Sequence, residues 1–217
     1  MKVLITTVPF GDKNRLPLDL LKKSKIEYII NPLNKKLDEE ELIKMIGDFD
    51  AIIAGTEKIS EKVLNKANKL KHISRVGIGL DSVDLLAAEK KGIKVSYTPD
   101  VPAPAIAELT IGMMLTLLRS THVSNSKMHN GEWHRVFGKR LSNVTIGLIG
   151  VGRVGIRVIK HLQGFDSPNI LANDLSKSVK ELDLPVQWVD KEKIFKEADV
   201  ITLHLPLTGL TKNLIKQ

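Results

Sequence analysis

The chain has 217 residues, of which 42% are hydrophobic and 27% are charged, as in ordinary water-soluble globular proteins of one or two domains. It contains no cysteine, which excludes disulfide bridges, thiolate metal sites and a cysteine nucleophile. The net charge of +8 comes from lysines spread along the chain, and only 4% of the residues are aromatic, so the charge favours a solvated surface over a nucleic-acid interface.

The sequence also argues against a membrane location. No apolar run approaches the roughly 18 residues that a membrane span requires. The first ten residues, MKVLITTVPF, read as an opening strand and lack the apolar stretch and cleavage site of a signal peptide. We therefore expect a cytoplasmic protein.

Short β-rich runs alternate with helical runs over the first hundred residues. We predict strands at residues 2–7, 26–30, 51–54, 70–75 and 94–96. We predict helices at residues 17–23, 38–46, 60–68 and 83–90, with Ser60 as the N-cap of the third. This alternation is typical of βαβ units around a parallel sheet, and it predicts a doubly wound, flavodoxin-like α/β domain.

The alternation of strands and helices stops after this first domain. Three prolines within residues 97–104 predict a linker. Residues 105–119, AIAELTIGMMLTLLR, are apolar almost all round, which is typical of a helix buried between layers or domains. Residues 122–139 are polar and are expected to be irregular. We therefore predict a substrate domain at residues 1–98 and a cofactor domain at residues 99–217.

The strongest chemical signal is a glycine-rich turn between a strand and a helix. An apolar strand from Val144 enters the G-x-G-x-x-G motif of Gly150, Gly152 and Gly155, and an amphipathic helix leaves it. In this motif the first glycine allows the tight turn, and the second lets a pyrophosphate approach the backbone. The third lets the helix pack closely on the strand. The pattern predicts a Rossmann domain that binds a dinucleotide.

Two further features of the sequence identify the dinucleotide. The backbone N–H groups of Arg153 and Val154, at the start of the helix, are expected to face the phosphates. A second strand at residues 169–173 ends at Asp174, about twenty residues past the glycines, where an acid binds the adenosine ribose. Because its carboxylate repels a 2′-phosphate, we predict NAD rather than NADP. In the alternative interpretation, Asp174 only caps the next segment.

A third strand, at residues 199–203, leads into His204, Leu205 and Pro206. We expect these residues to line the cofactor crevice, because ligands bind at the carboxyl ends of parallel strands. We interpret His204 as a structural or cofactor-lining residue rather than a catalytic base. The histidines show no paired metal-binding spacing, so we predict no metal.

Several segments stand in a characteristic order: RVGIGLDSVD at 75–84, IAE at 106–108, GEW at 131–133, the glycine motif, HLPLT at 204–208 and TKNLI at 211–215. Together they resemble the D-isomer-specific 2-hydroxyacid dehydrogenases, especially the branch that contains D-3-phosphoglycerate dehydrogenase. The resemblance implies an NAD-dependent oxidoreductase acting on the CH–OH group of a D-2-hydroxyacid, either 3-phosphoglycerate-like or of the glyoxylate and hydroxypyruvate type. It also implies a homodimer, with no nucleic-acid or membrane partner.

The resemblance also assigns substrate-binding residues. It implies that the backbone N–H groups of Ile78 and Gly79 hold the substrate carboxylate beside the nicotinamide, so that Ile78 borders the cofactor as well. Phosphoglycerate enzymes often have an arginine where this chain has Ala54, so Arg75 is the candidate contact for a substrate phosphate.

The catalytic arginine, glutamate and histidine of such an enzyme would lie beyond Gln217. The last strands of the Rossmann sheet and the returning C-terminal helix of the first domain would also be absent. We therefore expect the Rossmann domain to be incomplete and the chain to be an inactive fragment. The alternative is a non-catalytic NAD-sensing or corepressor-like protein on the same scaffold.

Overall fold

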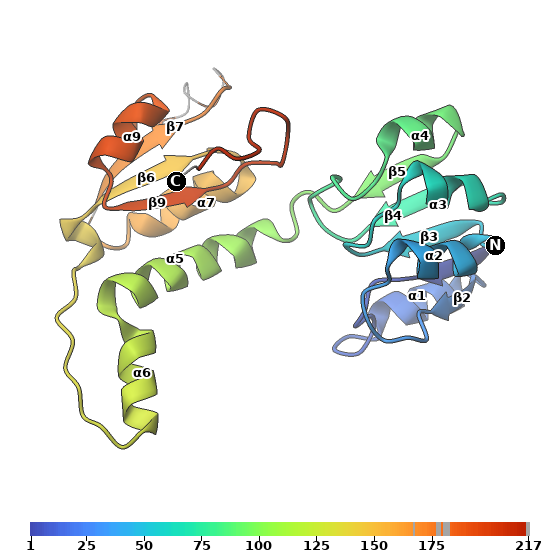
Figure 1. Cartoon of the computed structure of the whole chain (residues 1–217), viewed down its shortest axis with the longest axis horizontal. Helices are drawn as coiled ribbons and strands as arrows, with labels where there is room; N and C mark the ends of the chain where they lie inside the picture. Colours follow the sequence, from blue (N-terminus) through green and yellow to red (C-terminus); the bar gives the residue numbers. More distant parts are fainter. Residues whose placement is uncertain (167, 177–178, 180–182, 216–217) are drawn as a thin grey trace. The chain divides into compact units, whose positions relative to one another are not determined.

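The structure, a computed structural model, describes residues 1–217 except 167, 177–178, 180–182 and 216–217. The chain forms two compact units, Met1–Val101 and Pro102–Gln217 (Figure 1). None of the helices in the described part of the chain combines the length and apolarity that crossing a bilayer requires.

The first unit is built on a five-stranded parallel sheet. Its strands are β1 (Lys2–Ile5), β2 (Glu27–Ile30), β3 (Ala51–Ala54), β4 (His72–Arg75) and β5 (Lys94–Tyr97). Their order is β2-β1-β3-β4-β5, which is the flavodoxin-like order expected from the sequence. All the pairings are parallel, so the predicted fold class of this unit is confirmed.

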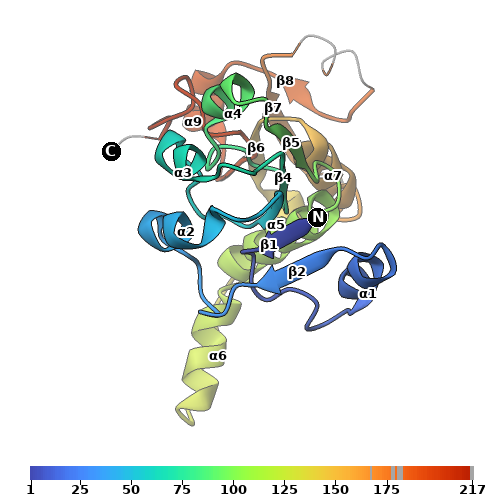
Figure 2. The same ribbon diagram turned by 90° about the vertical axis from the view of Figure 1, so that its right-hand side faces the viewer.

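Helices cover both faces of this sheet. They are α1 (Leu16–Lys23), α2 (Glu39–Ile46), α3 (Glu61–Lys66) and α4 (Leu85–Lys90). Leu4 and Ile73 pack with buried residues of α2, α3 and α4, whereas Val3 and Ile5 pack with Leu18 of α1. Figure 2 shows α1 on the opposite side of the sheet from the other three helices. This alternation along β1 places apolar side chains in a core on each face.

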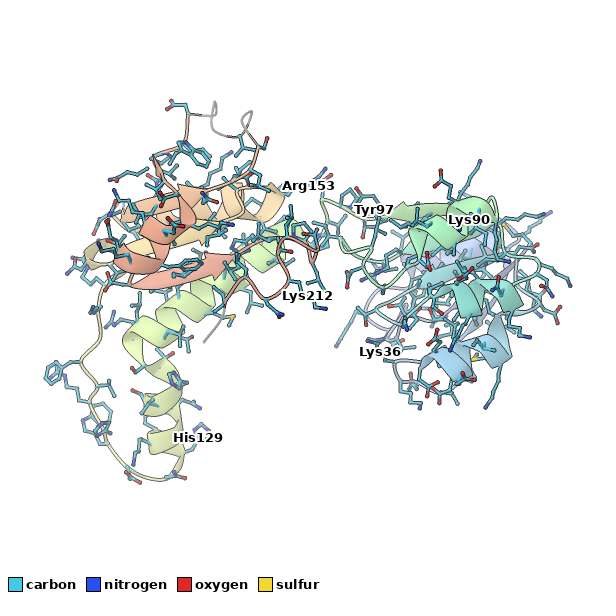
Figure 3. All side chains as sticks on the ribbon, turned by 45° about the horizontal axis from the view of Figure 1, so that its top comes forward. Lys36, Lys90, Tyr97, His129, Arg153 and Lys212 are labelled. Atoms are coloured by element: carbon cyan, nitrogen blue, oxygen red, sulfur yellow. The ribbon has the colours of Figure 1, made fainter. Side chains whose placement is uncertain are left out.

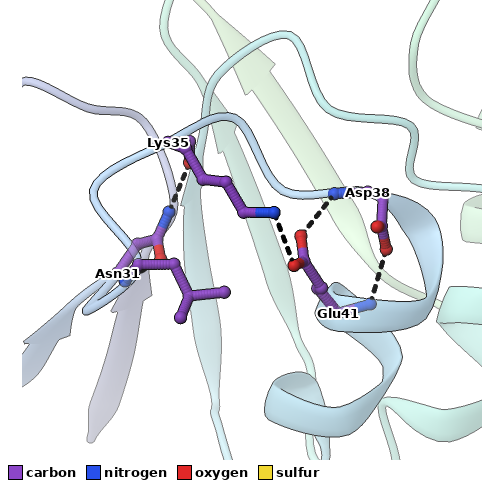
Figure 4. Close-up of polar contacts among 5 residues, drawn as sticks. Asn31, Lys35, Asp38 and Glu41 are labelled. Atoms are coloured by element: carbon purple, nitrogen blue, oxygen red, sulfur yellow. Dashed lines mark hydrogen bonds and ion pairs between the residues drawn. The ribbon is translucent and has the colours of Figure 1, made fainter.

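The start of α2 shows how the sequence fixes a helix end. The Asp38 carboxylate accepts a hydrogen bond from Glu41 N at 2.8 Å, and the Glu41 carboxylate accepts one from Asp38 N at 3.1 Å. Lys35 pairs with Glu41 at 2.7 Å, and this contact lowers the pKa of Glu41 (Figure 4). Asn31 accepts from Leu33 N and donates to the Lys35 carbonyl, which shapes the loop before the helix. The result is a complete capping box.

The second unit contains a four-stranded parallel sheet. Its strands are β6 (Thr145–Ile149), β7 (Asn169–Asn173), β8 (Gln187–Trp188) and β9 (Val200–Leu203), in the order β8-β7-β6-β9. Its α-helices include α5 (Ala103–Arg119), α6 (Thr121–His129), α7 (Arg153–Leu162) and α9 (Lys191–Glu197), and a 3₁₀ turn spans Leu141–Asn143. Residues of α5 and α7 pack with β6, whereas Ile194 of α9 packs with Ile149 and Leu171. This is the Rossmann arrangement that the glycine motif predicts.

Three expectations for the second unit were wrong. The helix expected at 105–119 begins at Ala103, because a proline at position 104 is compatible with the first turn of a helix. Residues 122–129 of the segment expected to be irregular belong to α6, which has no buried residue and therefore no apolar stripe that would predict it. The helix α5 is also not buried all round, since Leu109, Met113 and Leu117 are exposed.

Candidate functional site

Two glycines of the motif are required by the folded chain itself. Gly150 has φ of 94°, and a Cβ there would lie 2.4 Å from the carbonyl oxygen of His204. A Cβ at Gly155 would lie 2.3 Å from the carbonyl oxygen of Gly150. These glycines therefore allow the turn after β6 to approach the end of β9 and the first turn of α7.

Gly152 is different, because none of the described residues requires its small size. A Cβ at this position would have none of their atoms within 4 Å, and its φ of −86° is open to other residues. The space lies at the start of α7, a ten-residue helix that begins at Arg153 (Figure 3). The first N–H groups of a helix have no acceptor within it, so this opening is suited to an anion.

Asp174 is tied to the glycine loop. Its Oδ2 accepts a hydrogen bond from Val151 N at 2.7 Å, and its Oδ1 accepts one from Ser176 N at 2.8 Å. The capping role in the alternative interpretation is thus present at Ser176, although residues 177–178 of that segment lie outside the described residues. A carboxylate oxygen has further lone pairs, so capping leaves it able to accept hydrogen bonds from a ligand.

A pocket opens at the carboxyl ends of β6 and β7. Asp174 lines it together with mainly apolar residues: Ile149, Asn173, Leu175, Lys191, Leu205, Leu210, Thr211 and Leu214. The pocket combines apolar walls, which suit a flat heteroaromatic ring, with one carboxylate acceptor. It brings together Asp174 and Leu205, two of the residues singled out in the sequence.

His204 and Pro206 do not line this pocket, and their contact with a cofactor stays a prediction. The ring Nε2 of His204 lies 3.1 Å from Thr202 Oγ1, and its backbone N donates to Ile149 O at 2.9 Å. Burial lowers the pKa of the imidazole from 6.5. The Pro206 carbonyl accepts from Thr211 Oγ1 at 2.6 Å and shapes the loop after β9.

In the first unit, the loop after β4 presents unused backbone donors. Gly77 N donates to Thr98 Oγ1 at 2.8 Å, and Thr98 N donates to Gly77 O at 3.0 Å, so this end of the loop is fixed. Among the described residues, nothing accepts a hydrogen bond from the N–H groups of Ile78 and Gly79. Two adjacent free N–H donors are able to bind an anion such as a carboxylate.

Arg75 lies beneath this loop rather than projecting from it. Its side chain is buried, its Nη1 donates to the Val76 carbonyl, and a Cβ at Gly77 would lie 2.5 Å from that nitrogen. Its Nε is buried and has no partner within the described residues. The role of Arg75 toward a substrate phosphate stays a prediction.

Sequence reasoning did not single out several polar groups at the same edge of this sheet. Glu57 is buried, and its carboxylate accepts hydrogen bonds from Thr6 Oγ1 and from Gly55 N. Thr6 follows β1, and Gly55 follows β3. The sequence feature that could have identified Thr6 and Gly55 is their position directly after predicted strands, because parallel sheets bind ligands at the carboxyl ends of their strands. In the described part of the chain no cluster of histidine, aspartate or glutamate is suited to a metal ion.

Comparison with known proteins shows which family the sequence of the second unit matches. Residues 111–217 match the family model described as "D-isomer specific 2-hydroxyacid dehydrogenase, NAD binding domain". A hydroxypyruvate reductase from Thermotoga maritima is 37% identical over 201 residues, which cover 91% of this chain and 63% of that protein. A D-3-phosphoglycerate dehydrogenase from Methanocaldococcus jannaschii is 40% identical over 186 residues, covering 82% of this chain and 35% of that protein.

The chain is also similar to a solved structure. The NAD⁺-bound 3-phosphoglycerate dehydrogenase of Entamoeba histolytica superimposes with a TM-score of 0.78 at 30% identity. The match covers 97% of this chain and 64% of that one. The chain thus spans less than two thirds of the length of each of these three proteins.

Proposed function

Because this chain belongs to the D-isomer-specific 2-hydroxyacid dehydrogenase family, we propose that it carries the NAD site and the substrate-carboxylate site of an oxidoreductase acting on a 2-hydroxyacid. The bound cofactor supplies the hydride chemistry, between C4 of its nicotinamide and C2 of the acid. The observation that carries the proposal is the unfilled space at Gly152, at the start of α7, in the glycine loop that Val151 ties to Asp174.

Each part of this site has a distinct task. The N–H groups at the start of α7 bind the pyrophosphate, which needs the space left by Gly152. Asp174 accepts hydrogen bonds from the hydroxyls of the adenosine ribose. The apolar walls of the pocket, such as Leu175 and Leu205, enclose the adenine. The protein therefore binds and orients the cofactor.

The free N–H groups of Ile78 and Gly79 are proposed to hold the carboxylate of the substrate. Both 2-hydroxyacid classes named above, with and without a phosphate, have a carboxylate for this nest. The burial of Arg75 and its bond to the Val76 carbonyl favour an acid without a phosphate, of the hydroxypyruvate or glyoxylate type.

We also propose that the protein is a homodimer that forms through the outer face of α5. Leu109, Met113 and Leu117 are spaced by four residues and are all exposed, so they form one apolar stripe along the helix. Trp133 and Phe137, after α6, are also almost fully exposed. Exposed apolar surface of this extent marks an association site.

Met113→Glu should shift the protein toward monomer in analytical ultracentrifugation, whereas a monomeric unaltered protein would contradict the proposal.

The decisive experiment is a fluorescence titration of the purified 217-residue chain with NADH. We expect saturable binding that competes with NAD⁺. The absence of binding would contradict the proposed cofactor site. Turnover is then measured from NADH absorbance with hydroxypyruvate, glyoxylate and 3-phosphohydroxypyruvate. Turnover by this chain alone would contradict the expectation that the catalytic arginine, glutamate and histidine lie outside it.

A further inference from the structure

A lysine is held at the edge of the proposed adenosine pocket by the end of β7. Asn173 Nδ2 donates to the Val189 carbonyl at 2.7 Å, and Val189 N donates to Ala172 O at 2.9 Å. The chain then continues through Asp190, which accepts a hydrogen bond from Lys193 N, into Lys191, the first residue of α9. These bonds fix the backbone of Lys191 one residue beyond Asp190, so that its side chain lines the pocket that contains Asp174.

The charges in this pocket are not neutralised by each other. Asp174 and Lys191 are the two charged residues among the described residues that line it. The Asp174 carboxylate is held by the N–H groups of Val151 and Ser176 and forms no ion pair with Lys191. Within the described chain, the ammonium group of Lys191 has neither a hydrogen bond nor an ion pair. The pocket is thus lined by a carboxylate that the backbone holds and by a lysine whose ammonium group is unpaired within the described chain.

We propose that Lys191 is a specificity residue that binds a 2′-phosphate on the adenosine ribose. The inference rests on the proposed function, because it requires the pocket to hold adenosine. Asp174 accepts the ribose hydroxyls and disfavours a 2′-phosphate. Lys191 opposes this effect, since its long stem lets the ammonium reach a phosphate that the carboxylate repels. The protein therefore discriminates against NADP less strongly than Asp174 alone would dictate.

The test uses two ligands that lack the nicotinamide, ADP-ribose and 2′-phospho-ADP-ribose, titrated calorimetrically into the 217-residue chain. Lys191→Gln should weaken 2′-phospho-ADP-ribose about fivefold and change ADP-ribose less than about twofold. Asp174→Asn should strengthen 2′-phospho-ADP-ribose relative to ADP-ribose. This gain should be lost in the double variant Asp174→Asn/Lys191→Gln, because Lys191 is the cation among the described residues that line the pocket.

Lys193→Gln is the matched control, because it removes the same charge from the same helix and Lys193 does not line the pocket. It should leave both affinities unchanged. If Lys191→Gln weakens both ligands equally, or neither, the specificity role is overturned while the cofactor site stands. If ADP-ribose itself does not bind, the proposed function fails together with the inference. Thermal unfolding of each variant shows that the fold is retained.

Discussion

At the scale of single residues, the three glycines of one motif are needed for two different reasons. Gly150 and Gly155 allow close packing of backbone against backbone within the protein. Gly152 has open space around it among the described residues, so packing within the protein does not require its small size. The motif therefore separates two residues that packing requires from one whose proposed role is binding.

This difference gives a paired prediction. Gly152→Val should weaken NADH at least about tenfold, because its side chain occupies the space of the pyrophosphate, and should shift the melting temperature by no more than about 3 °C. Gly155→Val should lower the free energy of unfolding by about 2–4 kcal/mol, because its Cβ has no room beside the Gly150 carbonyl. NADH titration and thermal unfolding of both variants test this. A folded Gly152→Val protein that binds NADH normally would contradict the pyrophosphate role.

His204 predicts a dependence of stability on pH. Burial lowers the pKa of its imidazole in the folded state, so the unfolded chain, with a pKa near 6.5, binds the proton more readily. Well above pH 6.5 the imidazole is neutral in both states and has no effect. As the pH falls below this value, the free energy of unfolding should fall.

Urea unfolding at about pH 7.5 and pH 5.5 measures this loss. His204→Gln, which keeps a polar group near Thr202 Oγ1, should lose less stability over the same interval. An equal loss in both proteins would show that other groups cause the pH dependence.

The sequence was sufficient for the packing roles of Gly150 and Gly155, which follow from the spacing of a single motif. It also placed Asp174 at the end of the next strand, where its carboxylate contacts the glycine loop. Lys191 and Glu57 could not be found in this way, because each depends on contacts between segments distant in the chain. The hydrogen bond from Asn173 to the Val189 carbonyl holds the segment that leads to Lys191 beside the pocket. Glu57, which follows β3, accepts a hydrogen bond from Thr6, which follows β1.

At the scale of elements, α5 and α6 show where periodicity succeeds and fails. The strong apolar content of α5 predicted a helix. It did not predict that Leu109, Met113 and Leu117 are exposed on one face of that helix. Such a face has the same composition whether the protein or a partner covers it. The helix α6 begins after Ser120, whose φ of 50° ends α5. A left-handed serine is not visible in a sequence.

The helix caps of the first unit predict an order of stabilities. Asp38→Ala should lower the free energy of unfolding by about 1 kcal/mol, because it removes the hydrogen bond to Glu41 N. Ser60 is at the N-cap of α3, as expected, but its hydroxyl donates to Glu39 instead of capping the helix. Ser60→Ala should therefore have a smaller effect, below about 0.5 kcal/mol. Urea unfolding of both variants decides, and the reverse order would refute the capping assignment.

At the scale of the whole molecule, each unit has its own sheet and its own hydrophobic clusters. The parallel sheets of both units were predicted from the alternation of strands and helices and from the glycine motif. The short strand β8 and the helix α9 were not predicted, since α9 buries only Ile194 among its described residues and lacks an apolar stripe.

Separate cores predict separable effects of mutation. Ile73 is completely buried in the first unit, so Ile73→Ala should destabilise that unit by about 3 kcal/mol. The affinity for ADP-ribose, which the second unit is proposed to bind, should change less than about twofold at low temperature. Calorimetric titration at a temperature where both proteins are folded provides the measurement. A large loss of affinity would mean that the adenosine site depends on the first unit.

The contiguity of the first unit has a consequence for synthesis on the ribosome. All five of its strands lie within Met1–Val101, so every strand pairing of this sheet joins residues that are translated before the second unit. At about 5–20 residues per second, translation of the following hundred or so residues takes roughly 5–20 s. That interval is long compared with the folding of most small domains. The strands of the first sheet can therefore pair while the second unit is still being made, which keeps the unpaired strands of two parallel sheets from being exposed together.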